Sequence, residues 1–274
     1  MERSPPWSAD ELLATRDRAV ALAQEAGEVL LRHRREGLVA ESKGRRRELV
    51  TAADRDAERV VVGGIQRQWP SHAVLAEEGV LTAKGRSDRE ADWTWIVDPL
   101  DGTTNFVHGV PFFAVAIALA WRDRPVVGVV HAPALGDTYA AAAGLGAHWN
   151  GTRIQVSRTA ELADALVATG FSYERDEPGR DDNLGRLQRV LPRCRDVRRL
   201  GSAELDLCLC ARGTYDAYWE LYLAPYDVAA GAVIVREAGG RVTDLRGGED
   251  WLHGGRILAS NGALHEEMLA VCGD

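Results

Sequence analysis

The chain has 274 residues and a formal net charge of −8, with 46% hydrophobic and 27% charged residues. This composition predicts a globular protein with a sizeable core, and the negative charge argues against a nucleic-acid coat, which usually has a basic face. No apolar run approaches the roughly 18–20 residues of a membrane helix, and no secretory signal opens the chain, so we expect a cytoplasmic protein without a membrane segment.

The first half of the chain predicts two helices followed by antiparallel strands. Ser8 and Glu11 form a capping box that opens an amphipathic helix to about residue 33, and a second helix is expected over 53–68. The basic run 43–47 between them is expected to be a solvated loop. Short apolar runs predict strands over 73–76, 93–97, 114–121 and 126–131. The pair Asn150-Gly151 predicts a further hairpin, between 146–149 and 153–156.

The second half alternates between strands and helices. Strands are expected near 165–169, 197–200, 215–219, 241–244 and 256–259. Helices are expected after the polar loop 174–182 to about residue 191, over 202–211, over 225–238, and from 263 onward. The four cysteines show no CxxC pair and are expected to be free thiols. Early hairpins and later alternation indicate a layered α+β fold and not a simple doubly wound sheet.

The most informative segment for chemistry is 95–106, where an apolar strand runs into Asp98 and Asp101. Two carboxylates that converge at a strand end are costly unless a cation lies between them. Gly102 lets the main chain approach a ligand, and the amides of Gly102 and Thr103 have the chemistry to bind a phosphate. Taken alone, the segment is equally compatible with a solvent-exposed turn.

Acidic residues in three more segments favour the functional interpretation. Glu77 and Glu78 end the apolar run 73–76, Asp54 stands at the start of the second helix, and Asp227 stands at the start of the helix over 225–238. An aspartate at a helix start is often only an N-cap. The cap and the ligand interpretations therefore compete at Asp54 and Asp227, and the wider pattern must decide between them.

Together these segments resemble the inositol monophosphatase family, part of a group of lithium-sensitive, metal-dependent phosphatases that includes fructose-1,6-bisphosphatases. Both halves of the family signature are present, at 95–106 and 226–240. Further matches are Lys43, 49–51, Asp54, Glu77, Glu78, Asn150-Gly151, 201–203 and Glu220. The resemblance covers about residues 10–270. It implies a single phosphatase domain over 1–274, folded as a layered α/β/α/β/α sandwich with halves of about 8–150 and 151–274.

The resemblance also implies a site with two or three Mg²⁺ ions. Glu77, Asp98 and the Leu100 carbonyl would hold the first ion, Asp98, Asp101 and Asp227 the second, and Glu77 with waters a weaker third. Asp54 and Thr103 would orient and deprotonate the nucleophilic water. The amides of Gly102 and Thr103 would bind the phosphate. Asp101, the Ser202–Ala203 backbone and Glu220 would face the substrate's hydroxyls, with most metal ligands in the first half and Asp227 in the second.

The implied activity is hydrolysis of a small polyol phosphate, with inositol-1-phosphate as the expected substrate, by a homodimeric enzyme. Thr104 favours this branch of the family, because the nucleotide and histidinol phosphatase branches often carry Lys there. The alternatives are fructose-1,6-bisphosphate, histidinol phosphate, a nucleotide or a specialised cyclitol phosphate. A regulatory protein that keeps the fold and binds a protein or RNA is a rival of another class, but the acidic set is complete.

Two departures from the family pattern stand near the site. Tyr226 replaces the usual Trp before Asp227, which exchanges one aromatic residue for another. Glu204 stands where a small residue is common. We expect Glu204 to be either a surface glutamate of the helix over 202–211 or a residue beside the substrate pocket that alters specificity.

Overall fold

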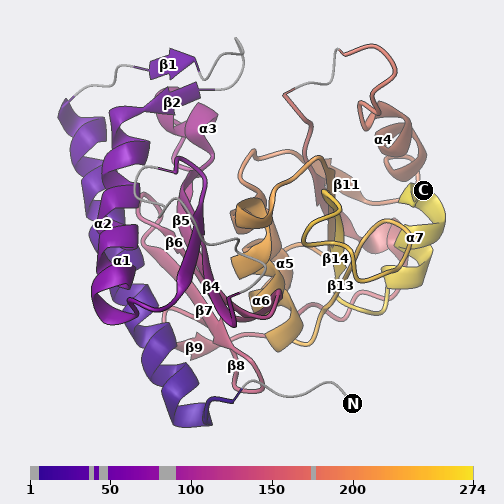
Figure 1. The fold of residues 1–274 in the computed structure, drawn as a ribbon. Coiled ribbons are helices and arrows are strands. Elements are labelled where there is room, and N and C mark those ends of the chain that lie inside the picture. The colour runs from indigo at the N-terminus through magenta and orange to yellow at the C-terminus, as the bar shows by residue number, and fades with distance from the viewer. Residues whose placement is uncertain (1–5, 37–39, 43–48, 80–90, 174–176, 274) are drawn as a thin grey trace.

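The computed structural model describes residues 6–36, 40–42, 49–79, 91–173 and 177–273. Five layers follow one another across the molecule (Figure 1): helices α1 and α2, a seven-stranded sheet, helices α5 and α6, a five-stranded sheet, and helices α4 and α7. The predicted layered α+β sandwich is confirmed. The basic run 43–47, including Lys43, lies outside the described residues. None of the described helices has both the length and the apolar character needed to cross a membrane.

The first layer consists of α1 (Ala9–Glu36) and α2 (Ala52–Gln68). The predicted capping box opens α1, because the Ser8 amide donates to Glu11 Oε2 at 2.7 Å and the Glu11 amide to Ser8 Oγ at 3.3 Å. The two helices pack closely at Gly64, where a Cβ atom would lie 2.2 Å from a methyl group of Leu22. The short strands β1 (Ala40–Ser42) and β2 (Leu49–Thr51) pair antiparallel, and the sequence did not predict them.

The seven-stranded sheet forms the second layer, with its strands in chain order. They are β3 (Ala73–Ala76), β4 (Trp93–Asp101), β5 (Ala114–Trp121), β6 (Arg124–Ala132), β7 (Asp137–Ala142), β8 (Gly146–Trp149) and β9 (Thr152–Arg153). Only the β3–β4 pair is parallel. The predicted hairpin turn at Asn150-Gly151 is confirmed, with positive φ at both residues. The sequence missed β7, because its run of alanines favours a helix when read alone.

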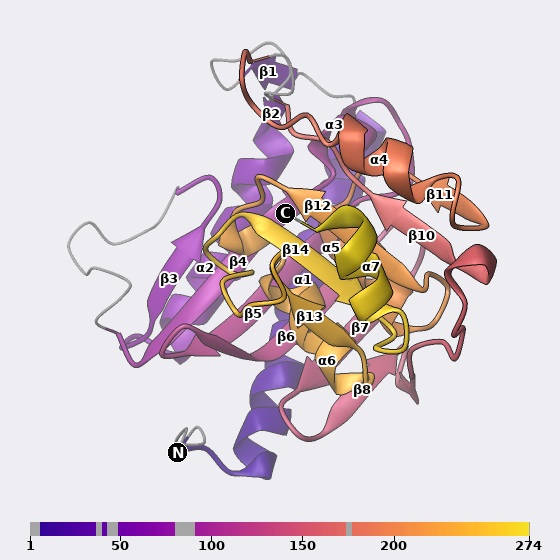
Figure 2. The same cartoon turned by 90° about the vertical axis from the view of Figure 1, so that its right-hand side faces the viewer.

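The five-stranded sheet forms the fourth layer, in the order β11-β10-β12-β14-β13 (Figure 2). Its strands are β10 (Leu166–Thr169), β11 (Asp196–Arg198), β12 (Ala217–Leu221), β13 (Arg241–Thr243) and β14 (Arg256–Ser260). Helices α4 (Leu184–Val190) and α7 (His265–Cys272) cover its outer face. Near the predicted strand 215–219, β12 begins and ends two residues later, which brings Glu220 into the strand.

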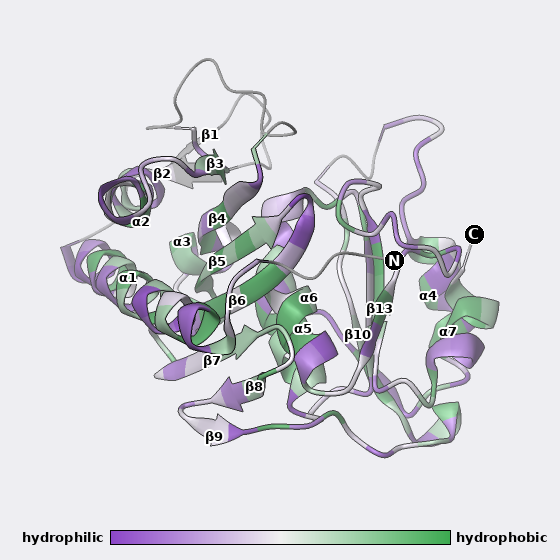
Figure 3. Ribbon diagram, turned by 60° about the horizontal axis from the view of Figure 1, so that its bottom comes forward, coloured by the Kyte–Doolittle hydropathy of each residue, from purple (hydrophilic) through white to green (hydrophobic). Residues whose placement is uncertain are grey.

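Between the sheets lie α5 (Ala203–Ala211) and α6 (Ala229–Glu237), which are apolar on nearly all sides (Figure 3). Such a pattern is expected for a helix that is buried on both faces. Helix α6 lies so close to β6 that a Cβ atom at Gly128 would stand 2.3 Å from the Ala230 carbonyl oxygen. The predicted helix over 225–238 begins instead with a 3₁₀ turn, Pro225–Asp227. The cysteines are free, as predicted, and only Cys194 is partly exposed.

Candidate active site

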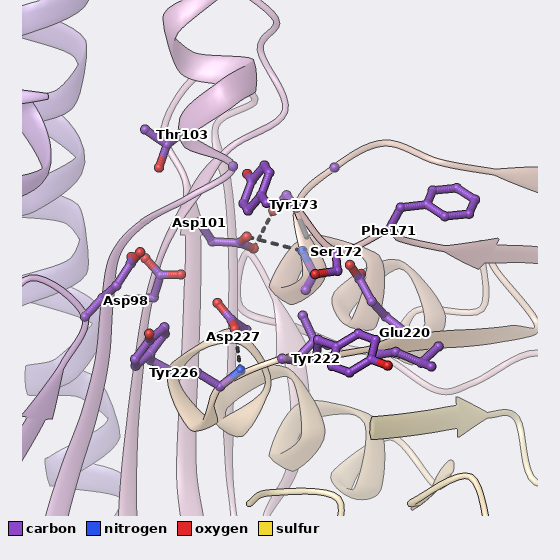
Figure 4. A pocket seen from close by; sticks show the side chains of 18 of the residues that line it. Asp98, Asp101, Thr103, Phe171, Ser172, Tyr173, Glu220, Tyr222, Tyr226 and Asp227 are labelled. Carbon is purple, nitrogen blue, oxygen red and sulfur yellow. Dashed lines mark hydrogen bonds between the residues drawn. The ribbon is translucent and has the colours of Figure 1, made fainter. Parts of the chain in front are cut away.

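A cavity of about 330 Å³ opens between the end of β4, the start of α5, strand β12 and the 3₁₀ turn before α6 (Figure 4). Its wall contains almost all the candidate residues that the sequence predicted. These are Glu77, Asp98, Leu100, Asp101, Gly102, Thr103, Ser202, Ala203, Glu220 and Asp227. Of the predicted set, only Asp54 does not line the cavity. Residues that are up to 150 positions apart in the chain therefore meet at one place.

The end of β4 turns two aspartates toward this cavity. In a regular strand, residues three apart point to opposite faces, but the pairing of β4 with β5 shifts register between Asp98 and Asp101. Asp98 is 2% exposed, and its Oδ1 accepts a hydrogen bond of 2.9 Å from the Leu100 amide. The irregular end of the strand thus lets both carboxylates line one cavity.

Gly102 follows with a φ of +90°, in the left-handed region. A Cβ atom there would lie 3.0 Å from the Phe112 carbonyl oxygen and 3.3 Å from that of Gly201. Both the backbone conformation and the space therefore require glycine. The turn leads into the short helix α3 (Thr103–Val107), whose first residue, Thr103, faces the cavity.

Asp54 supports Thr103 from behind the cavity wall. It is fully buried, and its Oδ2 accepts hydrogen bonds from the Thr51 amide at 2.8 Å and the Thr51 hydroxyl at 2.6 Å. The Thr103 hydroxyl lies 3.3 Å from Asp54 Oδ1 and 3.1 Å from the Leu100 carbonyl oxygen, and both can accept its proton. Burial raises the pKa of Asp54. The N-cap of α2 is Thr51 and not Asp54, which is the N3 residue of the capping box and also contacts the predicted partner Thr103.

Asp101 links β4 to the N-terminus of α5. Its carboxylate accepts hydrogen bonds from the Ser202 hydroxyl at 2.6 Å, the Ala203 amide at 3.2 Å and the Glu204 amide at 2.8 Å. Asp101 thereby takes the place of an N-cap for α5. The Ala203 amide, part of the backbone that was expected to face a substrate, is directed at Asp101, although Ser202 and Ala203 both line the cavity.

The carboxylates in the cavity raise one another's pKa. Burial, followed by the charge of Glu77, raises the pKa of Asp98 and of Asp227 well above the ordinary range. Burial also raises the pKa of Asp101 to about 6, against the hydrogen bonds from Ser202 and Glu204. Bringing several carboxylates together in this way is unfavourable without a cation to offset their charge.

The donor chemistry of this group fits a magnesium ion, which prefers carboxylate and carbonyl oxygens. As the side chains lie, no three His, Cys, Asp or Glu residues in the described part of the chain are grouped so that they could hold a metal ion. Each aspartate of the group has an oxygen engaged by a backbone amide, which for Asp227 is the amide of Ala224 at 2.6 Å. Ion binding would therefore compete with these local hydrogen bonds or share their oxygens.

Glu220 forms the opposite side of the cavity, on the same face of β12 as Tyr218. The Tyr218 hydroxyl donates to Glu220 Oε2 at 2.5 Å. Burial raises the pKa of Glu220 to about 7, partly offset by this hydrogen bond and by the charge of Arg199. Gly170 makes room for the carboxylate, because a Cβ atom there would lie 1.9 Å from Glu220 Oε2. The sequence did not predict this use of Gly170.

Sequence reasoning also missed much of the outer wall. Its members come from the segments after β10, β11 and β12, and are Phe171, Ser172, Tyr173, Arg180, Arg199 and Tyr222. The Arg180 guanidinium stacks 3.8 Å above the ring of Tyr222, and the Tyr173 hydroxyl lies 3.4 Å from Thr104 Oγ1. These residues belong to loops without a motif, so no spacing signal marked them.

The expectation that Glu204 is a surface glutamate is wrong, and its effect on specificity stays a prediction. Its side chain is fully buried, so it is not a surface glutamate, and it does not line the cavity. Its carboxylate accepts hydrogen bonds from the amides of Ala230 at 3.1 Å and Gly231 at 2.5 Å, in the first turn of α6. The sequence placed Glu204 at the start of its own helix but gave no signal that its partner would be the start of another.

Comparisons with known proteins find similar sequences and structures over most of the chain. A family model described as the inositol monophosphatase family matches residues 12–273. The chain is 41% identical over 254 residues to inositol monophosphatase 2 of Solanum lycopersicum, covering 92% of this chain and 96% of that protein. It is 39% identical over 255 residues to the Nus factor SuhB of Pseudomonas aeruginosa, covering 92% and 93%. The solved inositol monophosphatase of Anabaena (Nostoc) matches with a TM-score of 0.86 and 38% identity, covering 95% and 96%.

Proposed function

The chain belongs to the inositol monophosphatase family and is a phosphoric monoester hydrolase, and from this premise we propose that it is a magnesium-dependent enzyme whose main substrate is inositol-1-phosphate. One observation carries the proposal: Glu77, Asp98, Asp101 and Asp227 line a single cavity beside Gly102 and Thr103. Without bound cations, the negative charge of this acidic wall would repel a phosphate ester. Cations bound there would reverse the local charge and make the same wall attractive to an anionic substrate.

The metal-binding part of the proposal uses the acidic wall. Glu77, Asp98, the Leu100 carbonyl, Asp101 and Asp227 would hold two or three Mg²⁺ ions. Bound magnesium supplies positive charge that neutralises the phosphate and lowers the pKa of a water molecule. The raised pKa values of Asp98 and Asp227 support this role, because an adjacent cation favours the charged form of a carboxylate.

Proton transfer is assigned to Thr103 and Asp54. The Thr103 hydroxyl would accept a hydrogen bond from the attacking water and donate its own proton toward Asp54 Oδ1, 3.3 Å away. The capping box holds Asp54 in place through two hydrogen bonds from Thr51. The pKa of Asp54 is raised by burial, which makes it a better base than an exposed aspartate.

Substrate binding is assigned to the turn after β4 and to β12. The Gly102 and Thr103 amides would hold the phosphate, while Asp101, the Ser202–Ala203 backbone and Glu220 would contact hydroxyl groups of the polyol. Glu220 lies on the side of the cavity opposite the acidic wall in Figure 4 and is held by Tyr218. A carboxylate so placed suits a substrate that carries hydroxyls away from its phosphate.

The test is phosphate release from a panel of esters, with and without magnesium. We expect release that depends on magnesium, is inhibited by lithium, and has its highest kcat/KM with inositol-1-phosphate. Fructose-1,6-bisphosphate, histidinol phosphate, a nucleotide and p-nitrophenyl phosphate complete the panel. A higher kcat/KM for another ester would replace the substrate, and full hydrolysis in excess chelator would remove the metal from the proposal.

A second function is favoured by one observation, the 39% identity to a protein named Nus factor SuhB. A regulatory role through a protein or RNA partner is therefore the second candidate. The Asp98→Asn variant separates the two functions, because a purely regulatory role would survive the loss of catalysis.

We further propose one phosphatase domain over both halves and a cytoplasmic homodimer, supported by the family resemblance and, for the domain, by the core that the two halves share. Light scattering would test the dimer.

A further inference from the structure

The residues of the acidic wall come from two parts of the fold that are more than a hundred residues apart in the chain. Asp101 ends β4 in the first sheet, whereas Asp227 lies in the turn that leads into α6. A site that uses both carboxylates needs contacts that fix the position of α6 relative to β4. Glu204 makes hydrogen bonds to residues of both elements.

A continuous path of hydrogen bonds runs through Glu204. Its amide donates to Asp101 Oδ2 at 2.8 Å, which fixes the start of α5 to the end of β4. Its carboxylate then accepts from the amides of Ala230 and Gly231, which fixes the start of α6 to α5. Helix α6 has no side-chain cap of its own at Val228. Glu204 therefore provides, from a different helix, the acceptor that an N-cap normally supplies.

Besides the hydrogen bonds, Glu204 and its helix α5 pack closely against α6. A Cβ atom at Gly231 would lie 2.6 Å from Glu204 Oε2 and 2.6 Å from Leu207 Cβ. Helix α6 can approach α5 to this distance only because residue 231 is glycine. The first turn of α6 begins two residues after Asp227, so its position sets that of the Asp227 backbone.

We propose that Glu204 is a positioning residue of the acidic wall, which holds Asp227 at the distance from Asp101 that magnesium binding requires. The inference rests on the proposed magnesium-dependent function and adds a residue that touches neither metal nor substrate. Removal of a residue that orients metal ligands typically weakens metal binding by about 10- to 100-fold.

The chain offers a matched control for a merely structural role. Glu237, at the other end of α6, also accepts two backbone hydrogen bonds from another element, the amides of Gly144 and Gly146, both at 2.8 Å. Glu237 does not line the cavity. In either residue, a change to glutamine keeps one acceptor oxygen and turns an NH₂ group toward the second amide.

The experiment compares Glu204→Gln, Glu204→Asp and Glu237→Gln with the wild-type protein. Calorimetric titration gives the Kd for Mg²⁺, and thermal unfolding in chelator gives the stability. We expect all three variants to unfold at a lower temperature, but only the two Glu204 variants to bind Mg²⁺ about tenfold or more weakly. Glu204→Asp keeps the carboxyl group and shortens its reach, so it separates the position of the acceptor oxygens from the presence of a carboxyl group.

Each other outcome has a definite meaning. If Glu204→Gln binds Mg²⁺ within twofold of the wild type, or if Glu237→Gln loses as much affinity, Glu204 is only structural. If Glu204→Asp binds like the wild type while Glu204→Gln does not, the carboxyl group and not its position matters, and the inference is wrong. If the wild-type protein neither binds Mg²⁺ nor releases phosphate with it, the proposed function fails, and this inference with it.

Discussion

The two sides of the cavity are built in different ways. On the side of the first sheet, the aspartates are held by a strand end and by helix caps, and Asp98 and Asp101 are 2% and 8% exposed. On the side of the second sheet, the outer wall consists of loop residues, and Tyr173 is 43% exposed. The first side presents carboxylates, whereas the second presents aromatic rings and arginines around Glu220.

This difference indicates a division of labour. Buried carboxylates at strand and helix ends are held in place by hydrogen bonds from the backbone around them, so that side suits chemistry that must stay fixed. Exposed loop residues can change with little effect on the fold, so the other side suits the choice of substrate. Variants on the first side should therefore affect every substrate alike, and variants on the second side should affect substrates unequally.

Asp98→Asn should give the largest effect and tests the fixed side. We expect kcat to fall by about 10³-fold or more for every ester, because several kcal/mol of charge stabilisation would be lost with the metal ions. The metal-free variant should not unfold more easily, since the substitution removes a carboxylate whose pKa is raised by burial and by its neighbours. Asp92→Asn, just before the other end of β4, is the matched control. A variant within tenfold of the wild type would remove Asp98 from the metal site.

Thr103→Val should give the next largest effect on the same side. It keeps the shape of the side chain but removes the hydroxyl that contacts Asp54, so kcat should fall by about 100-fold or more with little change in KM. The adjacent Thr104, whose hydroxyl faces Tyr173, provides the control Thr104→Val, which should stay close to the wild type. Equal losses in both variants would show that the α3 turn, and not the Thr103 hydroxyl, is what matters.

Glu220→Gln tests the other side and should discriminate between substrates. Loss of one hydrogen bond to a charged acceptor costs about 1.5–3 kcal/mol, which corresponds to roughly a 10- to 150-fold lower kcat/KM for inositol-1-phosphate. p-Nitrophenyl phosphate has no ring hydroxyl and should be much less affected. Equal losses for both esters would place Glu220 in the catalytic machinery and would contradict the division between the two sides.

The sequence predicted the side of the cavity at the first sheet far better than the side at the second sheet, for a physical reason. Strand ends, helix caps and glycine turns depend on residues close together in the chain, so Asp54, Asp98, Asp101 and Gly102 stood out as local patterns. The resemblance to the family then favoured a functional site over an exposed turn and helix caps. Tyr173, Arg180 and Tyr222 come together only when loops from different parts of the chain fold over the cavity. No pattern of neighbouring residues in the sequence predicts that these loops come together.

The remaining errors have the same origin. Strand β7 was missed because its alanines favour a helix in isolation, while two neighbouring strands pair with it in the sheet. One of the two expectations for Glu204 placed it on the surface, because glutamate in a helix is usually exposed. Its actual partners, the Ala230 and Gly231 amides, lie on another helix, and only the packing of α5 against α6 could reveal them.

The smallest expected effect concerns the pH dependence of stability at His265, which does not line the cavity. This residue also tests how far from the cavity a substitution still affects activity. His265 is fully buried at the start of α7, with Nδ1 2.8 Å from Ser260 Oγ and Nε2 2.9 Å from Thr243 Oγ1. Burial, with the nearby charge of Arg241, lowers its pKa from 6.5 to about 4. The unfolded chain therefore takes up a proton at this residue before the folded protein does. The stability that neutral His265 confers is present above pH 6.5 and is lost as the pH falls toward 4.

Urea unfolding at pH 7 and pH 5 isolates this contribution when the wild type is compared with His265→Gln. The wild type should lose about 1–2 kcal/mol more than the variant between the two pH values, because only the wild type has this proton to bind. The exposed His253 provides the control His253→Gln, which should keep the wild-type dependence. At pH 7, kcat/KM should be the same in all three proteins, since neither histidine lines the cavity. If His265→Gln loses as much stability as the wild type, His265 is not the titrating group; if it loses activity at pH 7, the fixed side extends as far as α7.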